Sequence, residues 1–547
     1  MNNNFNIPNA RYALPLLMDA TLDELRTGLD AGHFTSLQLV QAYIRRIQQV
    51  NPLLDAITQI NPDACRHATQ LDNEREQMRR YSQVFNLGPL HGIPILIKNS
   101  IATEDNMDTT ASSHGIMGAR VPEDSNVVYK LRDAGAIILG KTRTQWSTLR
   151  DDSYDNYVDK WTLPGSQTKG AYFEGQCPKG SSGGCAVGAS IGLAWAALAT
   201  DTDGSITMPA SQSNVVGFKP TVGLTSRHLA IPQALRLESA DTLRLESVGT
   251  MTRTVKDAAY LMKAIIGRDR KDPYTARIPF DIYPNYVAAC REDGLQGMRV
   301  GFLRSLAWFF QICTYDLSLE KFNQALDVMR RAQATIVDGI VLNGAVNTDL
   351  DLDGNHHRRC ALDFSLDFPR HLCNLKETPK DIYSSIDLRD FARKNPKEPH
   401  PCCQTNVCAK VKTEKDEKPT SQELPEHEQG YLDELGVLTA FKEFELDALV
   451  TWPHIAATLC SRMGNICAIT VPFAKLGPER PIIPSDDGSI DSAPNKPYGI
   501  SFIGTSFQEE KLFKIAYAFE QLTQARSKVR PIVAPRTELE DFLVRRG

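Results

Sequence analysis

The sequence predicts an α/β fold in which helices cover a β-sheet on both faces. Short, nearly all-apolar runs rich in Ile, Leu and Val recur along the chain, and amphipathic helical patterns separate them. Strands that are apolar on both sides must be covered on both sides, so their alternation with helices indicates a layered arrangement. The 547 residues can bury a large core, and we expect one domain over residues 1–547.

The N-terminal part, about residues 19–85, is expected to be mainly helical. Asp19 or Thr21 can cap a first helix, and a second helix begins near Ser36. Apolar side chains recur at helical spacing in both, first at Leu22, Leu25 and Leu29, then at Leu37, Val40, Tyr43, Ile44 and Ile47.

Further along the chain, short apolar runs predict buried strands. They lie at residues 92–98, 136–140, 298–302, 446–450 and 499–504. Helical patterns occur at residues 127–131 and 508–526. The Ala-rich stretch 185–199 is interrupted by Gly188, Ser190 and Gly192, so we interpret it as a buried helix and not as a membrane span.

Composition excludes several classes of partner. The formal net charge of -5 and the pI of about 6.2 give no reason to expect nucleic acid or an anionic membrane as partner. No apolar run has the length of a transmembrane helix. The first residues lack the basic start and apolar region of a secretory signal. The twelve cysteines form no repeating framework, so we expect a cytoplasmic protein without a disulfide scaffold.

Two stretches look like additions to the fold. Residues 392–429 are rich in Lys, Glu, Pro and Thr, which predicts a flexible surface insertion. Its Cys402, Cys403 and Cys408 lie near His400, but their spacing matches no usual zinc pattern, so no metal site is expected. The pentapeptide Leu-Arg-Leu-Glu-Ser occurs at 235–239 and again at 243–247, and nothing in the sequence explains it.

The residues best suited to catalysis lie in two glycine-containing runs. Lys-Gly-Ser-Ser-Gly-Gly occupies residues 179–184, and Asp-Thr-Asp-Gly-Ser-Ile occupies residues 201–206. Such runs favour tight loops in which hydroxyls and backbone N–H groups converge on a ligand or an oxyanion. Gly180, Ser182 and Gly184 also match the nucleophile elbow of α/β-hydrolases, but that elbow follows a buried strand and residues 174–179 do not resemble one.

Six motifs, taken in order, resemble those of the amidase-signature enzymes. They are Gly-Ile-Pro-Ile-Leu-Ile-Lys at 92–98, the two runs above, Gly-Phe-Lys-Pro-Thr-Val-Gly-Leu at 217–224, Met-Thr-Arg-Thr-Val-Lys-Asp-Ala-Ala at 251–259 and Pro-Tyr-Gly-Ile-Ser-Phe-Ile-Gly at 497–504. Together they cover most of residues 20–530, and the stretch 165–178 is most similar to a fungal-type branch. The resemblance implies an α/β/α sandwich with a large mixed sheet, a signature core at about 86–265, and hydrolysis of a carboxylic amide.

The resemblance also implies roles for individual residues. Ser205 would be the nucleophile, Ser181 the bridging serine that follows a cis peptide bond, and Lys98 the base at the end of the relay. The oxyanion would be bound by the backbone N–H groups of Thr202, Asp203, Gly204 and Ser205. Gly180, Ser182 and Gly183 would support the loop.

Elementary chemistry agrees with this assignment. A serine hydroxyl is a weak nucleophile until a neighbouring group takes its proton. A lysine can take it only when neutral, and burial favours the neutral amine. Lys98 ends an apolar strand, where such burial is expected. The implied reaction needs no metal and no organic cofactor, and its partner is a small-molecule amide.

At four positions the sequence departs from the pattern of the family. Asn99 replaces an acidic residue, which could alter the electrostatics around Lys98, and Thr250 replaces a proline. Cys185 stands where a small residue is usual and is expected to pack. Arg143 replaces Asn and is interpreted either as a solvated surface residue or as a group that favours an anionic substrate.

Two rival functions fit the same motifs. In the first, the acyl-enzyme is captured by an amine or by ammonia, as in the glutamine-dependent amidotransferase subunit that shares the implied fold. In the second, the chain is a non-catalytic pseudoamidase. The intact Lys98, Ser181 and Ser205 argue against the second, while the departures at Asn99 and Thr250 are in its favour.

Overall fold

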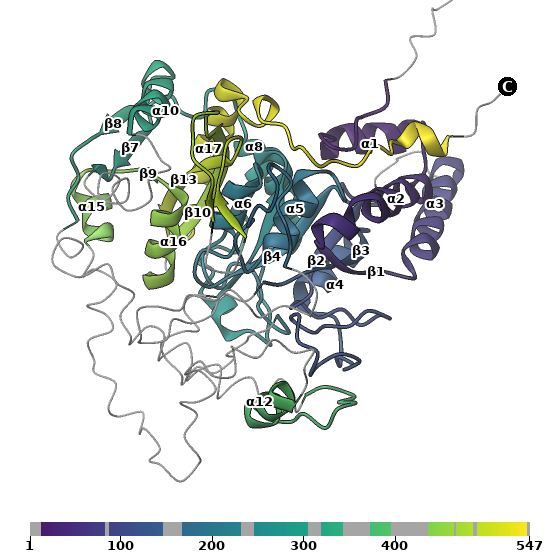
Figure 1. Cartoon of the computed structure of the whole chain (residues 1–547). Helices are drawn as coiled ribbons and strands as arrows, with labels where there is room; N and C mark the ends of the chain where they lie inside the picture. The colour runs from purple at the N-terminus through teal and green to yellow at the C-terminus, as the bar shows by residue number, and fades with distance from the viewer. Residues whose placement is uncertain are drawn as a thin grey trace, which may run out of the picture.

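One large sheet forms the centre of the molecule in the computed structural model (Figure 1). The residues that the structure describes are 13–81, 87–145, 167–230, 246–304, 319–342, 372, 374–394, 436–463, 466–484 and 489–543. Across these ranges, no helix combines the length and the apolar character that a bilayer crossing requires.

In the described residues the sheet has eleven strands, in the spatial order β1-β3-β2-β4-β6-β5-β10-β13-β9-β7-β8. Their bounds are β1 Ile57–Ile60, β2 Pro94–Lys98, β3 Ile137–Thr142, β4 Ala196–Asp201, β5 Val216–Lys219, β6 Ser247–Thr252, β7 Arg299–Phe302, β8 Thr335–Val337, β9 Ala448–Thr451, β10 Ile466–Lys475 and β13 Pro497–Thr505. β2 pairs in parallel with both β3 and β4, whereas β4 pairs with β6 antiparallel. The sheet is therefore mixed, as expected.

Two groups of helices cover the sheet and complete the three layers. The first group contacts β4, β10 and their neighbours and consists of α5 (Gly183–Ser190), α6 (Thr207–Gln212) and α16 (Pro453–Arg462). The second consists of α4 (Asn126–Asp133), α7 (Val255–Ile265), α8 (Tyr286–Ala289) and α17 (Glu509–Thr523). Around them lie α10 (Leu319–Arg331) and α15 (Val437–Glu443), while α12 (Ser385–Lys394) sits apart from the sheet on a small core of its own (Figure 1). The α/β sandwich predicted from the sequence is confirmed.

The N-terminal helices form where the capping signals predict them. α1 (Leu22–Ala31) begins with a capping box in which Thr21 and Glu24 satisfy each other's backbone N–H groups, and α2 (Ser36–Leu54) begins with an equivalent box at Thr35. α3 (Ala64–Tyr81) follows. The expected helical region also contains the edge strand β1, which pairs with β3. Four residues are too few to show a period, so the sequence pattern missed this strand.

The Ala-rich stretch corrects one prediction. Residues 185–199 do not form a single helix, because α5 ends at Ser190 and β4 begins at Ala196. The chain turns at Gly192, whose φ of 66° is left-handed and whose α-carbon faces the Leu17 carbonyl too closely for a side chain. Alanine and glycine are small enough for either structure, so the alternation that marks a strand was absent.

Two other predictions fall largely outside the described ranges. Of the expected insertion 392–429, only the last turn of α12 is described, and the cysteines near His400 are not. Of the duplicated pentapeptide, only Glu246 and Ser247 at the end of the second copy are described.

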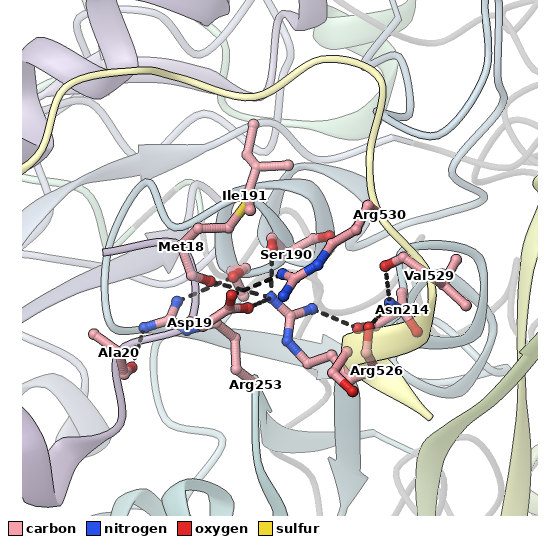
Figure 2. Close-up of polar contacts among 12 residues, drawn as sticks. Met18, Asp19, Ala20, Ser190, Ile191, Asn214, Arg253, Arg526, Val529 and Arg530 are labelled. Atoms are coloured by element: carbon pink, nitrogen blue, oxygen red, sulfur yellow. Dashed lines mark hydrogen bonds and ion pairs between the residues drawn. The ribbon is translucent and has the colours of Figure 1, made fainter. Parts of the chain in front are cut away.

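Three arginines hold the carboxyl end of α5. Arg46 and Arg253 are fully buried, and Arg526 comes from the C-terminal segment. Their guanidinium groups donate to the backbone carbonyls of Ala189 (3.1 Å), Ser190 (2.8 Å), Ile191 (3.0 Å), Gly192 (2.7 Å) and Ala194 (2.8 Å). Figure 2 shows how Arg253 and Arg526 converge here, with Asp19 and Arg530 beside them. Because helix carboxyl ends carry partial negative charge, these contacts are favourable, and they tie α2 and the segment at Arg526 to α5.

We expect Arg46→Met to lower the free energy of unfolding by about 3–5 kcal/mol, because the carbonyls of Ile191 and Gly192 and the partly buried Glu538 all lose their donor. Urea unfolding followed by fluorescence measures the change. Arg66→Met is the matched control, because Arg66 is largely exposed on α3 and its loss should cost no more than about 0.5 kcal/mol. Equal effects of the two variants would show that the carbonyl contacts carry no stability.

Candidate active site

Lys98, Ser181 and Ser205 lie together where the neighbouring strands β2 and β4 end. Lys98 is the last residue of β2, and Ser205 lies in the turn after β4. Because these parallel strands are neighbours, their carboxyl ends lie together. Ser181 precedes α5 and follows a cis peptide bond from Gly180, as the family resemblance implies. Lys98 Nζ is 2.6 Å from Ser181 Oγ, which is 3.1 Å from Ser205 Oγ.

The amine of Lys98 is buried among neutral oxygens. Only 1% of the residue is exposed, and Nζ contacts Thr200 Oγ1 (2.9 Å) and the Thr200 carbonyl (3.4 Å) in addition to Ser181. Among the described residues it forms no ion pair. Burial lowers the pKa of Lys98 to about 8, although the Cys185 thiol and the carboxylates of Glu246 and Asp201 oppose that shift. The neutral amine is therefore accessible near neutral pH.

The three side chains form a chain of hydrogen bonds that can run in either direction. When Lys98 is an ammonium, it donates to Ser181, and the Ser181 hydroxyl donates to Ser205. When Lys98 is neutral, its lone pair can accept from Ser181, and Ser181 can then accept from Ser205. The same contacts serve both states, since hydroxyl hydrogens rotate freely. When Lys98 loses one proton, the Ser205 hydroxyl therefore becomes the donor at the far end of this series of hydrogen bonds.

The loop before α5 is held by close packing. The Ser181 carbonyl accepts from the Gln145 backbone N–H at 2.9 Å, and Ser182 Oγ donates to the Thr200 carbonyl at 3.1 Å. A Cβ at Gly184 would lie 2.6 Å from the Ala56 carbonyl oxygen. Glycine is required there because backbone atoms already occupy the space.

The turn that carries Ser205 is organised by Asp201. Its two carboxylate oxygens accept from the backbone N–H groups of Gly204 (3.0 Å) and Ile206 (2.5 Å). The Gly204 N–H therefore already has a partner in the structure. The assignment of the backbone N–H groups of Thr202, Asp203, Gly204 and Ser205 as oxyanion donors stays a prediction.

The departures from the family pattern at Asn99 and Cys185 have structural explanations, whereas nothing in the described residues explains Thr250, whose buried hydroxyl has no hydrogen-bond partner there. Asn99 is buried and bridges two segments, since its Nδ2 donates to Ser112 Oγ (2.9 Å) and its Oδ1 accepts from Thr144 Oγ1 (2.5 Å). Thr250 is fully buried in β6. Cys185 packs in the core, as predicted, where burial raises the pKa of its thiol to about 11.

The interpretation of Arg143 as a solvated surface residue was wrong, because its side chain is 9% exposed and forms an ion pair with Asp55 at 2.6 Å. The alternative, that it favours an anionic substrate, stays a prediction. Its Nε also donates to the Asp55 carbonyl. Arg143 fastens the end of β3 to the residue that ends α2, a contact between distant segments that the local sequence does not reveal.

Sequence reasoning missed two residues beside the relay. Thr200 contacts Lys98 directly. This contact can be inferred only once β4 is known to end beside β2. Glu246 is 6% exposed and accepts a hydrogen bond from Thr202 Oγ1. Burial raises the pKa of Glu246 to about 7. The duplicated pentapeptide was the only signal that pointed to this position.

No metal centre is visible in the part of the chain that the structure describes, where no three His, Cys, Asp or Glu side chains are grouped to hold an ion. Lys98, Ser181 and Ser205 supply one amine and two hydroxyls, which is a donor set for proton transfer and not for metal binding.

Comparisons with known proteins agree with the geometry. The family model described as Amidase matches residues 38–341. A protein of Arthroderma benhamiae that carries the name amidase is 38% identical over 97% of this chain and 90% of its own length. The crystal structure of a peptide amidase from Stenotrophomonas maltophilia superposes with a TM-score of 0.73 and 29% identity, covering 95% of this chain and 99% of the other. The glutamyl-tRNA(Gln) amidotransferase of Chloroflexus aurantiacus has one subunit that is 33% identical over 58% of this chain and 60% of its own length.

We expect Gly184→Ala to destabilise the fold by about 1–3 kcal/mol, because the new methyl group meets the Ala56 carbonyl and the Arg143 backbone at 2.6–2.7 Å. Urea unfolding measures it. Gly88→Ala is the control, since its methyl group would lie 3.4 Å from its nearest neighbour and should change stability by less than about 0.5 kcal/mol. A Gly184→Ala protein as stable as the control would show that the α5 loop can shift at no cost.

Proposed function

The chain belongs to the amidase-signature family and is an amidohydrolase, and from this premise we propose that Ser205 cleaves the amide through a relay to Lys98 by way of Ser181. The observation that carries the proposal is the unbroken series of contacts from a buried amine, which has no ion-pair partner among the described residues, to the Ser205 hydroxyl, at 2.6 and 3.1 Å. An amide C–N bond is broken, and a carboxylic acid and an amine are released.

The reaction runs in two halves. Ser205 Oγ attacks the amide carbonyl as its proton passes to Ser181, while the Ser181 proton passes to neutral Lys98. The oxyanion is held by backbone N–H groups of the turn 202–205, where each donor typically lowers the barrier by about 3–4 kcal/mol. The proton then returns along the same relay to the leaving nitrogen. Water, activated in the same way, hydrolyses the ester on Ser205 and regenerates the enzyme.

Burial of Lys98 makes this chemistry feasible at physiological pH. With a pKa of about 8, roughly one tenth of the lysine is neutral at pH 7, whereas an ordinary lysine near 10.5 would be neutral in fewer than one molecule in a thousand. The hydroxyl of Thr200 and its carbonyl satisfy the amine without fixing its charge. A carboxylate in their place would hold the lysine protonated.

Acyl transfer to another acceptor is the second candidate. The likeness to the amidotransferase subunit favours it, since the same acyl-enzyme could be captured by an amine. That likeness covers 58% of this chain, whereas the relative named as an amidase covers 97%, so we assign water as the acceptor. Turnover of simple amides by the chain alone supports hydrolysis, and product formation only with an added amine would support transfer.

We further propose that the enzyme acts on a small-molecule amide in the cytoplasm without a metal or an organic cofactor. The six cysteines within the described ranges are all free thiols, as a reducing compartment favours. Turnover that persists in a metal chelator supports the cofactor-free reaction, and its loss would contradict it.

Substitution of the relay residues gives the first test. Ser205→Ala should abolish labelling by a fluorophosphonate probe, and Ser205→Ala, Ser181→Ala and Lys98→Met should each reduce amide turnover at least about a thousandfold. Ser527→Ala is the control, because this serine is exposed far along the chain and should label and turn over as the wild type does. A folded wild type that the probe does not label would instead support a non-catalytic protein.

The pH dependence gives the second test. Because only the neutral amine of Lys98 accepts a proton, kcat/KM should rise about tenfold per pH unit below about 8 and level off above it. Initial rates on a neutral amide between pH 5 and 10 measure the profile. A profile that is flat through pH 8, or that falls there, would contradict the assignment of Lys98 as the base.

A further inference from the structure

A buried carboxyl group that the reaction above does not use lies behind the Ser205 turn. β4 and β6 are antiparallel and pair Asp201 with Ser247, so Glu246 lies just before β6, beside Thr202. Thr202 Oγ1 donates to Glu246 Oε2. The other oxygen, Oε1, is buried and has no hydrogen-bond partner among the described residues. A buried carboxyl oxygen left without a donor is costly, so the position of Glu246 needs a physical explanation.

The charged groups that face Glu246 come from three elements. They are Lys98 at the end of β2, Asp201 at the end of β4, and Arg227 in the segment after β5. Arg227 is already paired with buried Asp272, at 2.7 and 2.8 Å. Lys98, by contrast, has no ion-pair partner in the described part of the chain. Among the described residues Lys98, Asp201 and Glu246 form no salt bridge, but the carboxylate of Asp201 is satisfied by the backbone N–H groups of Gly204 and Ile206.

Thr200 and Thr202 connect the two groups through one strand end. Lys98 Nζ contacts Thr200 Oγ1, and Thr202, two residues on, binds Glu246. Thr200 lies in β4 and Thr202 lies directly after it, in the turn that carries Ser205. Glu246 is linked to that turn by its hydrogen bond to Thr202, and its charge acts on Lys98.

We propose that Glu246 is a positioning residue of the relay, which fixes the oxyanion turn through Thr202 and whose charge acts on the proton that Lys98 holds. The proposal rests on the relay from Lys98 to Ser205. An ionised Glu246 stabilises the Lys98 ammonium and so opposes its action as base, while a protonated Glu246 releases it. Burial raises the pKa of Glu246 to about 7, so both states are populated at neutral pH.

Glu246→Gln tests the negative charge of Glu246 separately from its hydrogen bond with Thr202. The amide oxygen of glutamine can still accept from Thr202, but the negative charge is gone, so the acid limb of kcat/KM should move to lower pH by about half a unit to one unit. Glu246→Asp keeps the charge and shortens the reach to Thr202, so the limb should return towards that of the wild type while kcat falls. A purely structural residue would change kcat or stability in both variants without moving the limb.

Glu509→Gln is the matched control. Glu509 is also a buried glutamate that accepts from a threonine, Thr221 (2.5 Å), and also has one unpartnered oxygen, but Lys98 is not among the charges that act on it. Its pH profile should match that of the wild type. An unmoved limb in Glu246→Gln, or equal shifts in both variants, would overturn the proposal. Fluorophosphonate labelling of Ser205 in each variant keeps this outcome distinct from failure of the relay itself, in which the wild type would not label.

Discussion

The active-site architecture depends on burying an amine without giving it an anion. β2 is buried along its whole length, and Lys98 at its end reaches only hydroxyl and carbonyl oxygens. Any carboxylate in contact would stabilise the ammonium and abolish the base. The nearest acids, Asp201 and Glu246, are instead bonded to the following turn. This single constraint accounts for the uncharged lining contributed by Thr200 and Ser181.

At the carboxyl end of α5, three arginines carry charge into the interior, in contrast to the neutral amine of Lys98. Arg46, Arg253 and Arg526 keep their charge in the interior because backbone carbonyls and a few carboxylates receive them. α5 is only eight residues long, so anchoring its carboxyl end also locates the residues just before its first turn, Ser181 and Ser182. The segments 18–20 and 526–530, which contribute no residue to the relay, meet at this end of α5 and thereby help to hold Ser181 in place (Figure 2).

Local signals predicted the parts of this structure that depend on local physics. The capping residue Thr21, the apolar strand 94–98 and the glycine loop 180–184 each have a short-range cause, and the family motifs identified the three residues that the structure brings together. The sequence was uninformative where a distant partner decides the outcome. Asp55 determines the position of Arg143, and the pairing of β4 with β6 brings Glu246 to Thr202. The periodicity of the local sequence carries no information about such distant partners.

The two carboxyl groups at the turn pose an electrostatic problem that their placement resolves. Asp201 engages the N–H groups of Gly204 and Ile206, and Glu246 engages the Thr202 hydroxyl, so the turn is held from both sides. Two negative charges next to an oxyanion would raise the barrier to attack. Asp201 is compensated by the N–H groups that it accepts, but Glu246 has only one hydroxyl donor. Burial raises the pKa of Glu246 to about 7, so about half of the molecules carry a proton there at neutral pH, and in these the turn can be rigid and still receive an anion.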